Sequence, residues 1–473
     1  MDKPTLYEMS SAGRRGIRLP ECDVEERALP SHLVRNEIGL PQLSEPQIAR
    51  HYLNLSQRNF GVDSGFYPLG SCTMKYNPKA SEIWARLPGF CHIHPLQAPE
   101  DVQGALALMF DLQEQLEEIA GFARVALQPA AGAQGELTAL LMMRAYNDRR
   151  GEGQRDVVLV PDSAHGTNPA SVTMAGYVAV EVPSDERGDV DIGAVKAACG
   201  DRLAGIMLTN PNTLGLFEER IDELVELVHG CGGLVYGDGA NLNALTGIVR
   251  PGDLGIDLMH FNLHKTFATP HGGGGPGSGP VGVCAALAPF LPGPLVERSQ
   301  DTDGAYGLAS PEHSIGRMVA FHGNFGMFVR AWSYLRRLGA DGLREAAMHA
   351  VLNANYLRAE LSSEYTVPFD RTCMHEFVCE GTPKGTSAKA LDVSKRLMDY
   401  GFHPPTNYFP LTVSEALMIE PTETEDKGTL DAFVRAMRQV AEEARTDPKK
   451  LHEAPHRTPV RRIDEVKAAR DLI

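Results

Sequence analysis

The sequence predicts an α/β fold with a mostly parallel sheet in a large domain, a smaller C-terminal α+β domain and an N-terminal arm. Three observations support this prediction. Between residues 99 and 330, short apolar runs alternate with helical segments, as in buried parallel strands joined by helices. Residues 331–473 combine longer helices with short strand candidates, whereas residues 1–98 are rich in Pro and Gly and weakly periodic. The length of 473 residues is also too great for one hydrophobic core.

The N-terminal arm, residues 1–98, contains only short helical stretches and cannot bury itself well. We expect it to wrap a partner or the main domain. The first long helix is predicted over residues 101–120, with Asp101 as its cap and Gly121 at its end. Its apolar residues recur at helical spacing: Ala105, Leu108, Met109, Leu112, Leu116 and Ile119.

The alternation of strands and helices continues from this helix to about residue 330. Strands are predicted at residues 157–160, 205–208, 234–236 and 282–284, and a helix at 218–230. The smaller domain should contain helices at 342–361, 386–400 and 428–445 around strands near 375–380 and 408–420. Residues 447–473 are polar and are expected to form a surface tail.

Composition excludes several classes of function. The net charge of −16 argues against nucleic-acid binding, since no basic excess is available to displace counterions. Eight scattered cysteines without a Cys-x-x-Cys pair indicate reduced thiols. No run of 18 apolar residues indicates a membrane span, and the first residues lack a secretory core. We therefore expect a cytoplasmic protein that contacts neither membrane nor nucleic acid.

Three polar loops follow predicted strands, at residues 161–170, 209–215 and 238–241. In parallel sheets, ligands bind beyond the carboxyl ends of the strands. The shared placement of the three loops predicts a ligand site at that edge.

Asp238 and Lys265 are the most informative pair in this region. Asp238 ends an apolar strand, and Lys265 follows about one βα unit later, before a glycine-rich loop. An amine in this place can form a Schiff base with pyridoxal phosphate (PLP), and the carboxylate can hold the ring nitrogen protonated, which makes the ring an electron sink. The spacing equally allows a surface lysine near an aspartate that caps a helix.

Two further segments have a functional and a structural interpretation. Small residues at 128–136 precede an apolar helix expected to begin near Leu137; they allow a phosphate to approach the helix N-terminus, or they form a plain loop. His165 follows the strand at 157–160 and could stack on a planar cofactor, although a lone histidine is often structural.

Metal and dinucleotide sites are not predicted. His92-Ile93-His94 and the pair His264 and His271 lack an accompanying cluster of carboxylates or cysteines. The glycine run at 272–279 does not match Gly-x-Gly-x-x-Gly at the start of a helix. Residues 70–78 could offer a cation and hydroxyls to a substrate carboxylate or form a structured turn, and Cys72 lacks an identifiable base.

Several longer motifs resemble one known family, the P-protein of the glycine cleavage system. They are Tyr-Pro-Leu-Gly-Ser-Cys-Thr-Met-Lys-Tyr-Asn-Pro at 67–78, Asp-Ser-Ala-His-Gly-Thr-Asn-Pro-Ala at 162–170, Leu-Thr-Asn-Pro-Asn-Thr-Leu-Gly at 208–215 and Asn-Leu-His-Lys-Thr-Phe at 262–267. The resemblance spans about residues 6–470 and fits the C-terminal half of the longer single-chain members. It implies a PLP fold-type-I (aspartate aminotransferase-like) architecture and the second subunit of a two-subunit glycine dehydrogenase (decarboxylating).

The resemblance also implies an activity and partners. The expected reaction is the PLP-dependent decarboxylation of glycine, with release of CO2 and transfer of the aminomethyl group to the lipoyl arm of H-protein. The expected partners are lipoylated H-protein and a subunit 1, in an α2β2 heterotetramer. Motif positions imply that Lys265 is the Schiff-base lysine, Asp238 the pyridinium partner and His165 the ring-stacking residue, and that the phosphate lies at Gly132, Ala133, Gln134 and Gly135.

Two other functions remain open from the sequence. Another fold-type-I PLP enzyme acting on a small amino acid, such as an aminotransferase or a decarboxylase, would share Lys265 and Asp238 without a lipoyl carrier. A non-catalytic scaffold subunit is the third possibility, and the intact Asp238 and Lys265 argue against it.

Overall fold

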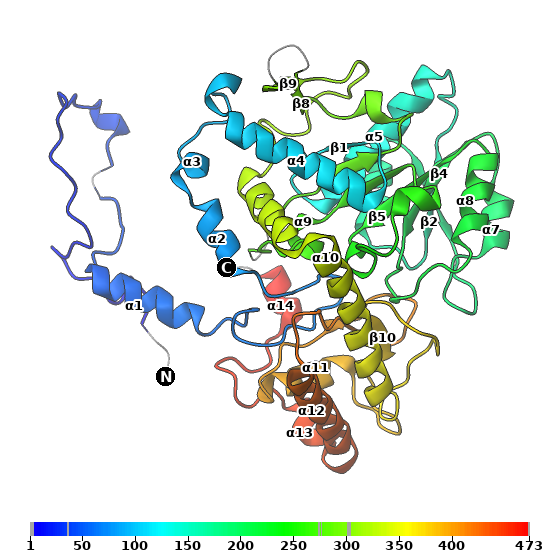
Figure 1. Cartoon of the computed structure of the whole chain (residues 1–473). Coiled ribbons are helices and arrows are strands. Elements are labelled where there is room, and N and C mark those ends of the chain that lie inside the picture. The colour runs from blue at the N-terminus through cyan, green and yellow to red at the C-terminus, as the bar shows by residue number, and fades with distance from the viewer. Residues whose placement is uncertain (1–3, 36, 273–274, 276, 300–303, 472–473) are drawn as a thin grey trace. The chain divides into compact units, whose positions relative to one another are not determined.

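The computed structural model describes residues 4–35, 37–272, 275, 277–299 and 304–471 (Figure 1). Part of the glycine run at 272–279 lies outside these residues. The chain divides into two compact units, Met1–Gly65 and Phe66–Ile473. The predicted division at residues 98 and 330 remains a prediction.

The first unit has mostly extended backbone and one α-helix, α1 (Glu45–Ser56). Ser44 begins this helix through a capping box, in which its N–H donates to Gln47 Oε1 at 3.0 Å. Among the described residues of the unit, only Leu43 is buried. This unit therefore has almost no hydrophobic core of its own.

A seven-stranded sheet forms the centre of the second unit. Its strand order is β1-β7-β6-β5-β4-β2-β3, and the five strands from β6 to β3 are parallel, whereas β7 is antiparallel to both of its neighbours. The mostly parallel sheet predicted from the apolar runs is confirmed. The strands span Arg124–Ala126 (β1), Val157–Pro161 (β2), Val178–Val182 (β3), Leu203–Thr209 (β4), Leu234–Gly239 (β5), Leu258–Phe261 (β6) and Val281–Val283 (β7).

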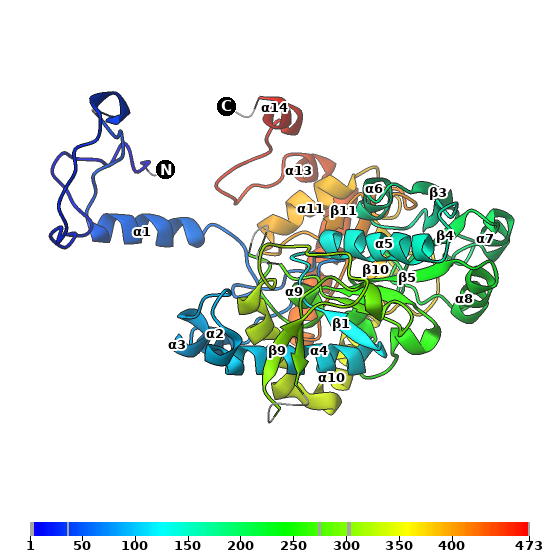
Figure 2. The ribbon, with the colours of Figure 1, turned by 90° about the horizontal axis from the view of Figure 1, so that it is seen from above.

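Helices cover both faces of this sheet (Figure 2). Successive strand residues point to opposite faces, so Met207 packs beneath one layer and Ile206 beneath the other. The first layer contains α5 (Gly132–Arg149) and α6 (Thr167–Met174). The opposite layer contains α4 (Gln103–Ala120), α7 (Ile192–Ala198), α8 (Ile221–Gly230) and the first part of α10 (Phe325–Leu361).

Most predicted elements are present, with shifted ends. The helix predicted at 101–120 is α4, and Gly121 ends it with a left-handed φ of 76°. Asp101 does not cap it: Asp101 lies in a 3-10 turn, and Val102 occupies the cap without a side-chain hydrogen bond. The helix predicted at 218–230 begins only at Ile221.

A second hydrophobic core lies in the C-terminal part. A three-stranded antiparallel sheet, ordered β10-β12-β11, packs with helices around Phe377, Leu417 and Phe433. These elements span Phe377–Glu380 (β10), Thr406–Asn407 (β11), Ala416–Ile419 (β12), Ala390–Asp399 (α11) and Lys427–Thr446 (α12). The helix predicted at 342–361 is the end of α10, which begins at Phe325 and is interrupted at Gly339 (φ 63°).

The remaining elements complete the second unit. They are α2 (Lys79–Ala85), α3 (Pro88–Cys91), α9 (Leu263–Thr266), β8 (Leu295–Arg298), β9 (Tyr306–Ala309), α13 (Pro448–His452) and α14 (Glu465–Arg470). The expected surface tail after residue 447 is only partly exposed, because Leu451 and Ala454 are fully buried. Within the described residues, no helix combines the length and the apolar character that crossing a bilayer requires.

Candidate active site

A cavity of about 180 Å³ lies beyond the carboxyl ends of β2, β4, β5 and β6. Lys265, Asp238 and His165 all line it, as do Gly132 and Ala133. The three loops predicted to meet at this edge therefore contribute to one cavity. Its other lining residues are Ser71, Glu136, Thr167, Thr209, Thr213, Ala240, His260, Asn262 and His264.

Lys265 reaches the cavity from α9, a single helical turn after β6. Leu263 and Thr266 are buried and anchor this turn, which leaves Lys265 half-buried at the cavity wall. Its Nζ donates to the backbone oxygen of Ser71 at 2.7 Å. The lysine is therefore held inside the site, and the alternative of a surface lysine is wrong.

Asp238 faces the same cavity from the end of β5 and is 5% exposed. Burial raises the pKa of this carboxyl group, but the charges of His260 and Lys265 and the hydrogen bonds from the Ala240 N–H and Asn168 together lower it by more. The resulting pKa lies below the ordinary value, so Asp238 is ionised at neutral pH. Its oxygens accept from the Ala240 N–H at 2.9 Å and from Asn168 Nδ2 at 3.2 Å.

His260 is a site residue that the sequence analysis missed. It pairs with Asp238 in the register of β5 and β6, and its Nε2 lies 3.5 Å from Asp238 Oδ1. Its Nδ1 lies 2.5 Å from Tyr236 Oη, so a buried Tyr–His–Asp chain ends at the cavity. The sequence signal is weak, because the neighbouring Met259 and Phe261 make this segment resemble an ordinary core strand.

The N-terminus of α5 forms another wall. The helix begins at Gly132, five residues before the expected start near Leu137. The first N–H groups of a helix lack an intrahelical acceptor, which makes them donors for an anion. A Cβ on Gly132 would lie 2.6 Å from Asn262 Nδ2, so any larger residue would have to displace that amide group.

Gln134 and Gly135 lie in the same helix but are not among the residues that line the cavity. Gln134 Oε1 accepts from the Ala130 N–H at 2.7 Å, and its Nε2 donates to Met318 O at 2.9 Å. The Gly135 N–H already donates to Ala131 O at 2.9 Å. A contact of either residue with phosphate remains a prediction.

His165 follows β2 and is exposed at the cavity. Its Nδ1 lies 2.9 Å from Thr167 Oγ1, which donates to the buried carboxylate of Glu136 at 2.7 Å. The imidazole is thus tethered at one nitrogen while its ring stays available to a ligand.

Thr209 supplies a second missed feature. It ends β4 beside Asp238, and its Oγ1 is buried at the cavity without a hydrogen-bond partner among the described residues. A buried hydroxyl without a protein partner is available to hydrogen-bond a bound group. An amine, an ionised carboxylate, an anion-binding helix end and this hydroxyl together fit the aldehyde, ring nitrogen, phosphate and ring oxygen of PLP.

The loop at residues 70–78 contributes only part of what the sequence suggested. Ser71 lines the cavity, but Lys75 is 2% exposed and its Nζ contacts Glu423 Oε1 at 2.6 Å, away from the lining residues. Lys75 is therefore not a free cation for a substrate. Burial raises the pKa of the Cys72 thiol to about 11, so this group is not a ready nucleophile.

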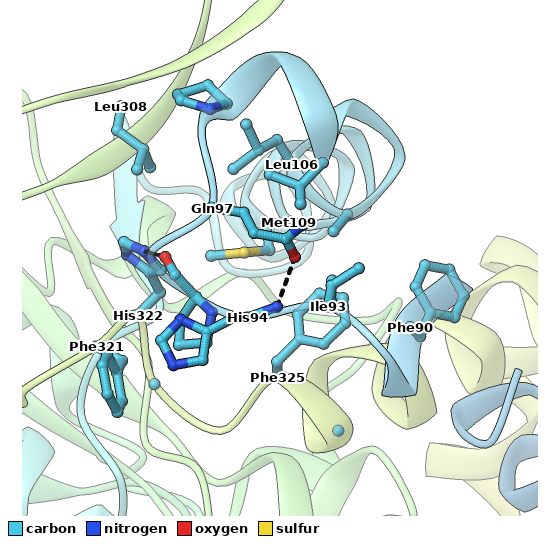
Figure 3. A pocket seen from close by; sticks show the side chains of 16 residues that line it. Phe90, Ile93, His94, Gln97, Leu106, Met109, Leu308, Phe321, His322 and Phe325 are labelled. Carbon is cyan, nitrogen blue, oxygen red and sulfur yellow. Dashed lines mark hydrogen bonds between the residues drawn. The ribbon is translucent and has the colours of Figure 1, made fainter. Parts of the chain in front are cut away.

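In the part of the chain that the structure describes, no histidine that lines this cavity belongs to a group of possible metal ligands. His264 and His271 have rings 5.2 Å apart, and burial lowers their pKa values to about 3 and about 4. His94 lies at a separate cavity (Figure 3). Among the described residues, one group of three possible metal ligands lies close together, at His375, Glu376 and Glu420.

The separate cavity is larger, at about 320 Å³, but its walls are mainly apolar (Figure 3). Side chains such as Leu106, Met109 and Phe325 line it, and the His94 N–H donates to Gln97 Oε1 at 2.7 Å. It has neither an amine nor a carboxylate in its lining. Volume alone therefore does not identify the site of chemistry.

Known proteins match this chain along nearly its whole length. A family model described as glycine dehydrogenase, C-terminal domain, matches residues 346–457. A probable glycine dehydrogenase (decarboxylating) subunit 2 of Caldanaerobacter subterraneus subsp. tengcongensis is 56% identical, over 99% of this chain and 97% of the relative. A protein of the same name from Staphylococcus haemolyticus is 55% identical, over 99% of this chain and 96% of the relative.

Solved structures confirm the predicted fold class. A glycine decarboxylase (P-protein) in inhibitor-bound form superposes with a TM-score of 0.73 at 23% identity, over 87% of this chain and 93% of the other. A Lactobacillus brevis glutamate decarboxylase superposes with a TM-score of 0.65 at 14% identity, over 93% and 98%. Because the relatives at 55–56% identity cover almost the whole sequence, the chain belongs to the glycine dehydrogenase (decarboxylating) subunit 2 family of P-proteins.

Proposed function

We propose that this chain binds PLP at Lys265 and decarboxylates glycine, releasing CO2 and passing the aminomethyl group to the lipoyl arm of H-protein. The observation that carries the proposal is the convergence of Lys265, Asp238 and His165 on one cavity next to the N-terminus of α5. Family membership selects glycine among possible amino-acid substrates.

Bound PLP would supply an electron sink for the pair of electrons left when a carboxylate departs. The side chains would hold the cofactor in the orientation that this chemistry needs. Lys265 would hold the aldehyde end, the first N–H groups of α5 the phosphate, and His165 one face of the ring. Asp238 would keep a proton on the ring nitrogen, since its own low pKa keeps it anionic.

When the amine of Lys265 is not attached to the cofactor, it needs a hydrogen-bond acceptor. The Ser71 carbonyl, 2.7 Å from Nζ, offers one inside the cavity. An amine held there stays close enough to return, and it can take up or give a proton at Nζ. His165 is a second group that could move a proton, at the imidazole nitrogen opposite its Thr167 contact.

The partners follow from the family. The relatives carry the designation subunit 2, and we propose a subunit 1 partner in an α2β2 heterotetramer that works in the cytoplasm. The lipoyl arm of H-protein would enter the cavity from outside. A PLP-dependent aminotransferase or simple decarboxylase would share the same cavity but would need neither partner.

An isotope-exchange assay tests the proposal. Labelled bicarbonate should enter the carboxyl group of glycine when the chain is combined with PLP, subunit 1 and lipoylated H-protein. Exchange that is unchanged without H-protein would favour the alternative enzymes, and no exchange under any condition would contradict the proposal.

A covalent trap tests the role of Lys265 separately. Borohydride treatment of the PLP-loaded chain, followed by peptide mapping, should place the reduced adduct on Lys265. Lys265→Ala should lose the adduct, and the exposed Lys449→Ala should keep it as a matched control. An adduct elsewhere, or none in the wild type, would contradict the role of Lys265 and favour a scaffold.

A further inference from the structure

Two buried glutamates lie behind the wall formed by Ser71 and have no part in the proposed chemistry. Glu376 precedes β10 and Glu420 follows β12, and the antiparallel pairing of Phe377 with Ile419 brings them together. Their exposures are 0% and 1%. An oxygen of each carboxyl group and a nitrogen of His375 all lie within 4.8 Å of one another.

The two carboxyl groups hold one loop from its inner side. Glu376 Oε2 accepts from the Ser71 N–H at 2.6 Å, and Glu420 Oε2 accepts from the Thr73 N–H at 2.9 Å. Glu420 Oε1 also accepts from Thr73 Oγ1 at 2.5 Å. Ser71 and Thr73 have left-handed φ values of 61° and 45°, which side chains disfavour, so these contacts maintain a conformation that the backbone alone resists.

This loop connects the glutamates to the cavity. Ser71 receives the Glu376 contact at its N–H and offers its carbonyl to Lys265 Nζ at 2.7 Å. The position of that carbonyl, and so of the unattached amine, therefore depends on the carboxyl pair. Neither glutamate lines the cavity.

The formal charges around the two glutamates predict that the cluster binds one proton. The cations are Lys265 and Lys75, and the carboxyl groups are Glu376, Glu420 and Glu423, the last being paired with Lys75 at 2.6 Å. Two positive charges face three carboxyl groups. One bound proton makes the cluster neutral, and burial this deep strongly disfavours a net charge.

The other titratable neighbours do not alter this balance. Burial lowers the pKa of His375 to about 3, so its ring is neutral. Burial raises the pKa values of the Cys72 thiol and the Tyr334 phenol, which also stay neutral. Asp238 lies near Lys265 as well, but it is opposed by its own partner His260.

The hydrogen bonds indicate which carboxyl group holds the proton. Burial raises the pKa of Glu420, but Glu420 accepts twice from Thr73 and interacts with both lysines, and these contacts oppose the rise. Glu376 accepts from the Ser71 N–H and more weakly from Asn241 Nδ2 at 3.3 Å. Burial and the charge of Glu420 raise the pKa of Glu376 well above its ordinary value.

We propose that the pair Glu376 and Glu420 binds a single proton, on Glu376, and that this pair is a positioning device that holds the Ser71 carbonyl opposite the Lys265 amine. The position of the proton does not depend on the reaction. The importance of the Ser71 carbonyl for turnover rests on the proposed function.

Infrared spectroscopy of the full chain tests the proton directly. At about pH 9, two other carboxyl groups, the buried Glu218 and the half-buried Glu425, whose pKa values are about 7, have ionised. A carboxylic-acid band that persists in the wild type at this pH and disappears in Glu376→Gln supports the proposal. Glu443→Gln is the matched control, because Glu443 is a buried glutamate with a pKa of about 2 and should leave the band in place. Absence of the band from the wild type overturns the proposal even if no variant folds.

The two isosteric variants should differ in function. Gln resembles a protonated Glu, so Glu376→Gln should keep glycine–bicarbonate exchange within about 3-fold of the wild type. Glu420→Gln removes the remaining negative charge and should lower exchange more than about 10-fold. Hydrogen exchange of the peptide over residues 69–75 should accelerate in Glu420→Gln only. Equal effects of the two variants overturn the assignment of the proton to Glu376.

Metal analysis provides a further check. A stoichiometric divalent cation bound through His375, Glu376 and Glu420 would keep both carboxyl groups ionised and would overturn the proposal. The infrared and metal measurements need no turnover. Failure of the wild-type exchange assay would therefore contradict the proposed function while leaving the proton on Glu376 supported.

Discussion

Asp238 and His260 lie opposite each other on adjacent parallel strands, with His260 Nε2 3.5 Å from Asp238 Oδ1. Both side chains are almost completely buried. A carboxylate in such a place normally gains a proton, because burial penalises its charge. The adjacent histidine opposes this penalty, so the strand pairing that builds the sheet also helps to keep the carboxylate that faces the cavity ionised.

Replacing His260 should shift the protonation of Asp238. In His260→Phe the opposing charge is lost, so the pKa of Asp238 should rise, and the acidic limb of the pH–rate profile should move to higher pH. The measurement is kcat/KM for glycine–bicarbonate exchange across the acidic range. Tyr236→Phe is the control: it removes the phenol at 2.5 Å from Nδ1 but keeps the imidazole, so its limb should move less. An unmoved limb in His260→Phe would contradict this role.

Asp238→Asn should separate folding from chemistry. The amide retains an acceptor for the Ala240 N–H, and Asn168, whose Oδ1 has no partner among the described atoms, can turn to meet the new donor. Unfolding should therefore change little. The amide cannot hold a proton on the ring nitrogen, so exchange should fall by at least about 100-fold. Normal turnover in this variant would discard the assignment of Asp238.

Gly132→Ala should weaken cofactor binding without unfolding the chain. The added methyl group would lie 2.6 Å from Asn262 Nδ2 and 3.0 Å from His260 Nε2, at the helix end proposed to bind phosphate. We expect the dissociation constant for PLP to rise at least about 10-fold, measured by absorbance titration. Gly104→Ala is the matched control, since a methyl group there would meet no atom within 4 Å and its helix, α4, contributes nothing to the cavity lining. Equal PLP affinity in both variants would show that Gly132 is not part of the phosphate-binding site.

Sequence patterns predicted those parts of the site whose placement depends on residues that are neighbours in the chain. The apolar runs at 157–160, 205–208 and 234–236 became β2, β4 and β5, and the polar loops after them met at one edge, as parallel pairing requires. Asp238 was identifiable because it follows such a run, and Lys265 because it comes about one βα unit later, before the glycine run. The start of α5 was misplaced, since Gly132, Ala133 and Gly135 have little apolar periodicity even though they form the first helical turn.

Features that depend on contacts between distant segments could not be predicted. Glu376 and Glu420 act on Ser71 and Thr73 across more than 300 positions, and nothing near either glutamate in the sequence marks it as buried beside the other. Lys75 looked available for a substrate because its partner Glu423 is equally remote. His260 was concealed because a strand pairing, not a motif, gives it its role.

An ion pair between α11 and α12 should stabilise the C-terminal core, away from the cavity. Arg396 on α11 donates to Glu443 on α12 through Nε at 2.7 Å and Nη2 at 3.0 Å, and both side chains are buried. Burial raises the pKa of Glu443, but hydrogen bonds from Arg396 and Lys450 outweigh it and lower the pKa to about 2. The ion pair thus stabilises the fold above the ordinary carboxyl pKa, and this contribution is lost as pH falls toward 2. Glu443→Gln removes one of the two carboxylates that face the buried Arg396, which keeps its contact with Asp399 Oδ2 at 2.9 Å, and should lower the free energy of unfolding by about 2 kcal/mol at neutral pH. Urea denaturation at neutral and acidic pH would measure both effects, with the exposed neighbour Glu442→Gln as control. A loss of stability equal to that of the control would show that Asp399 alone is enough to balance the charge of Arg396.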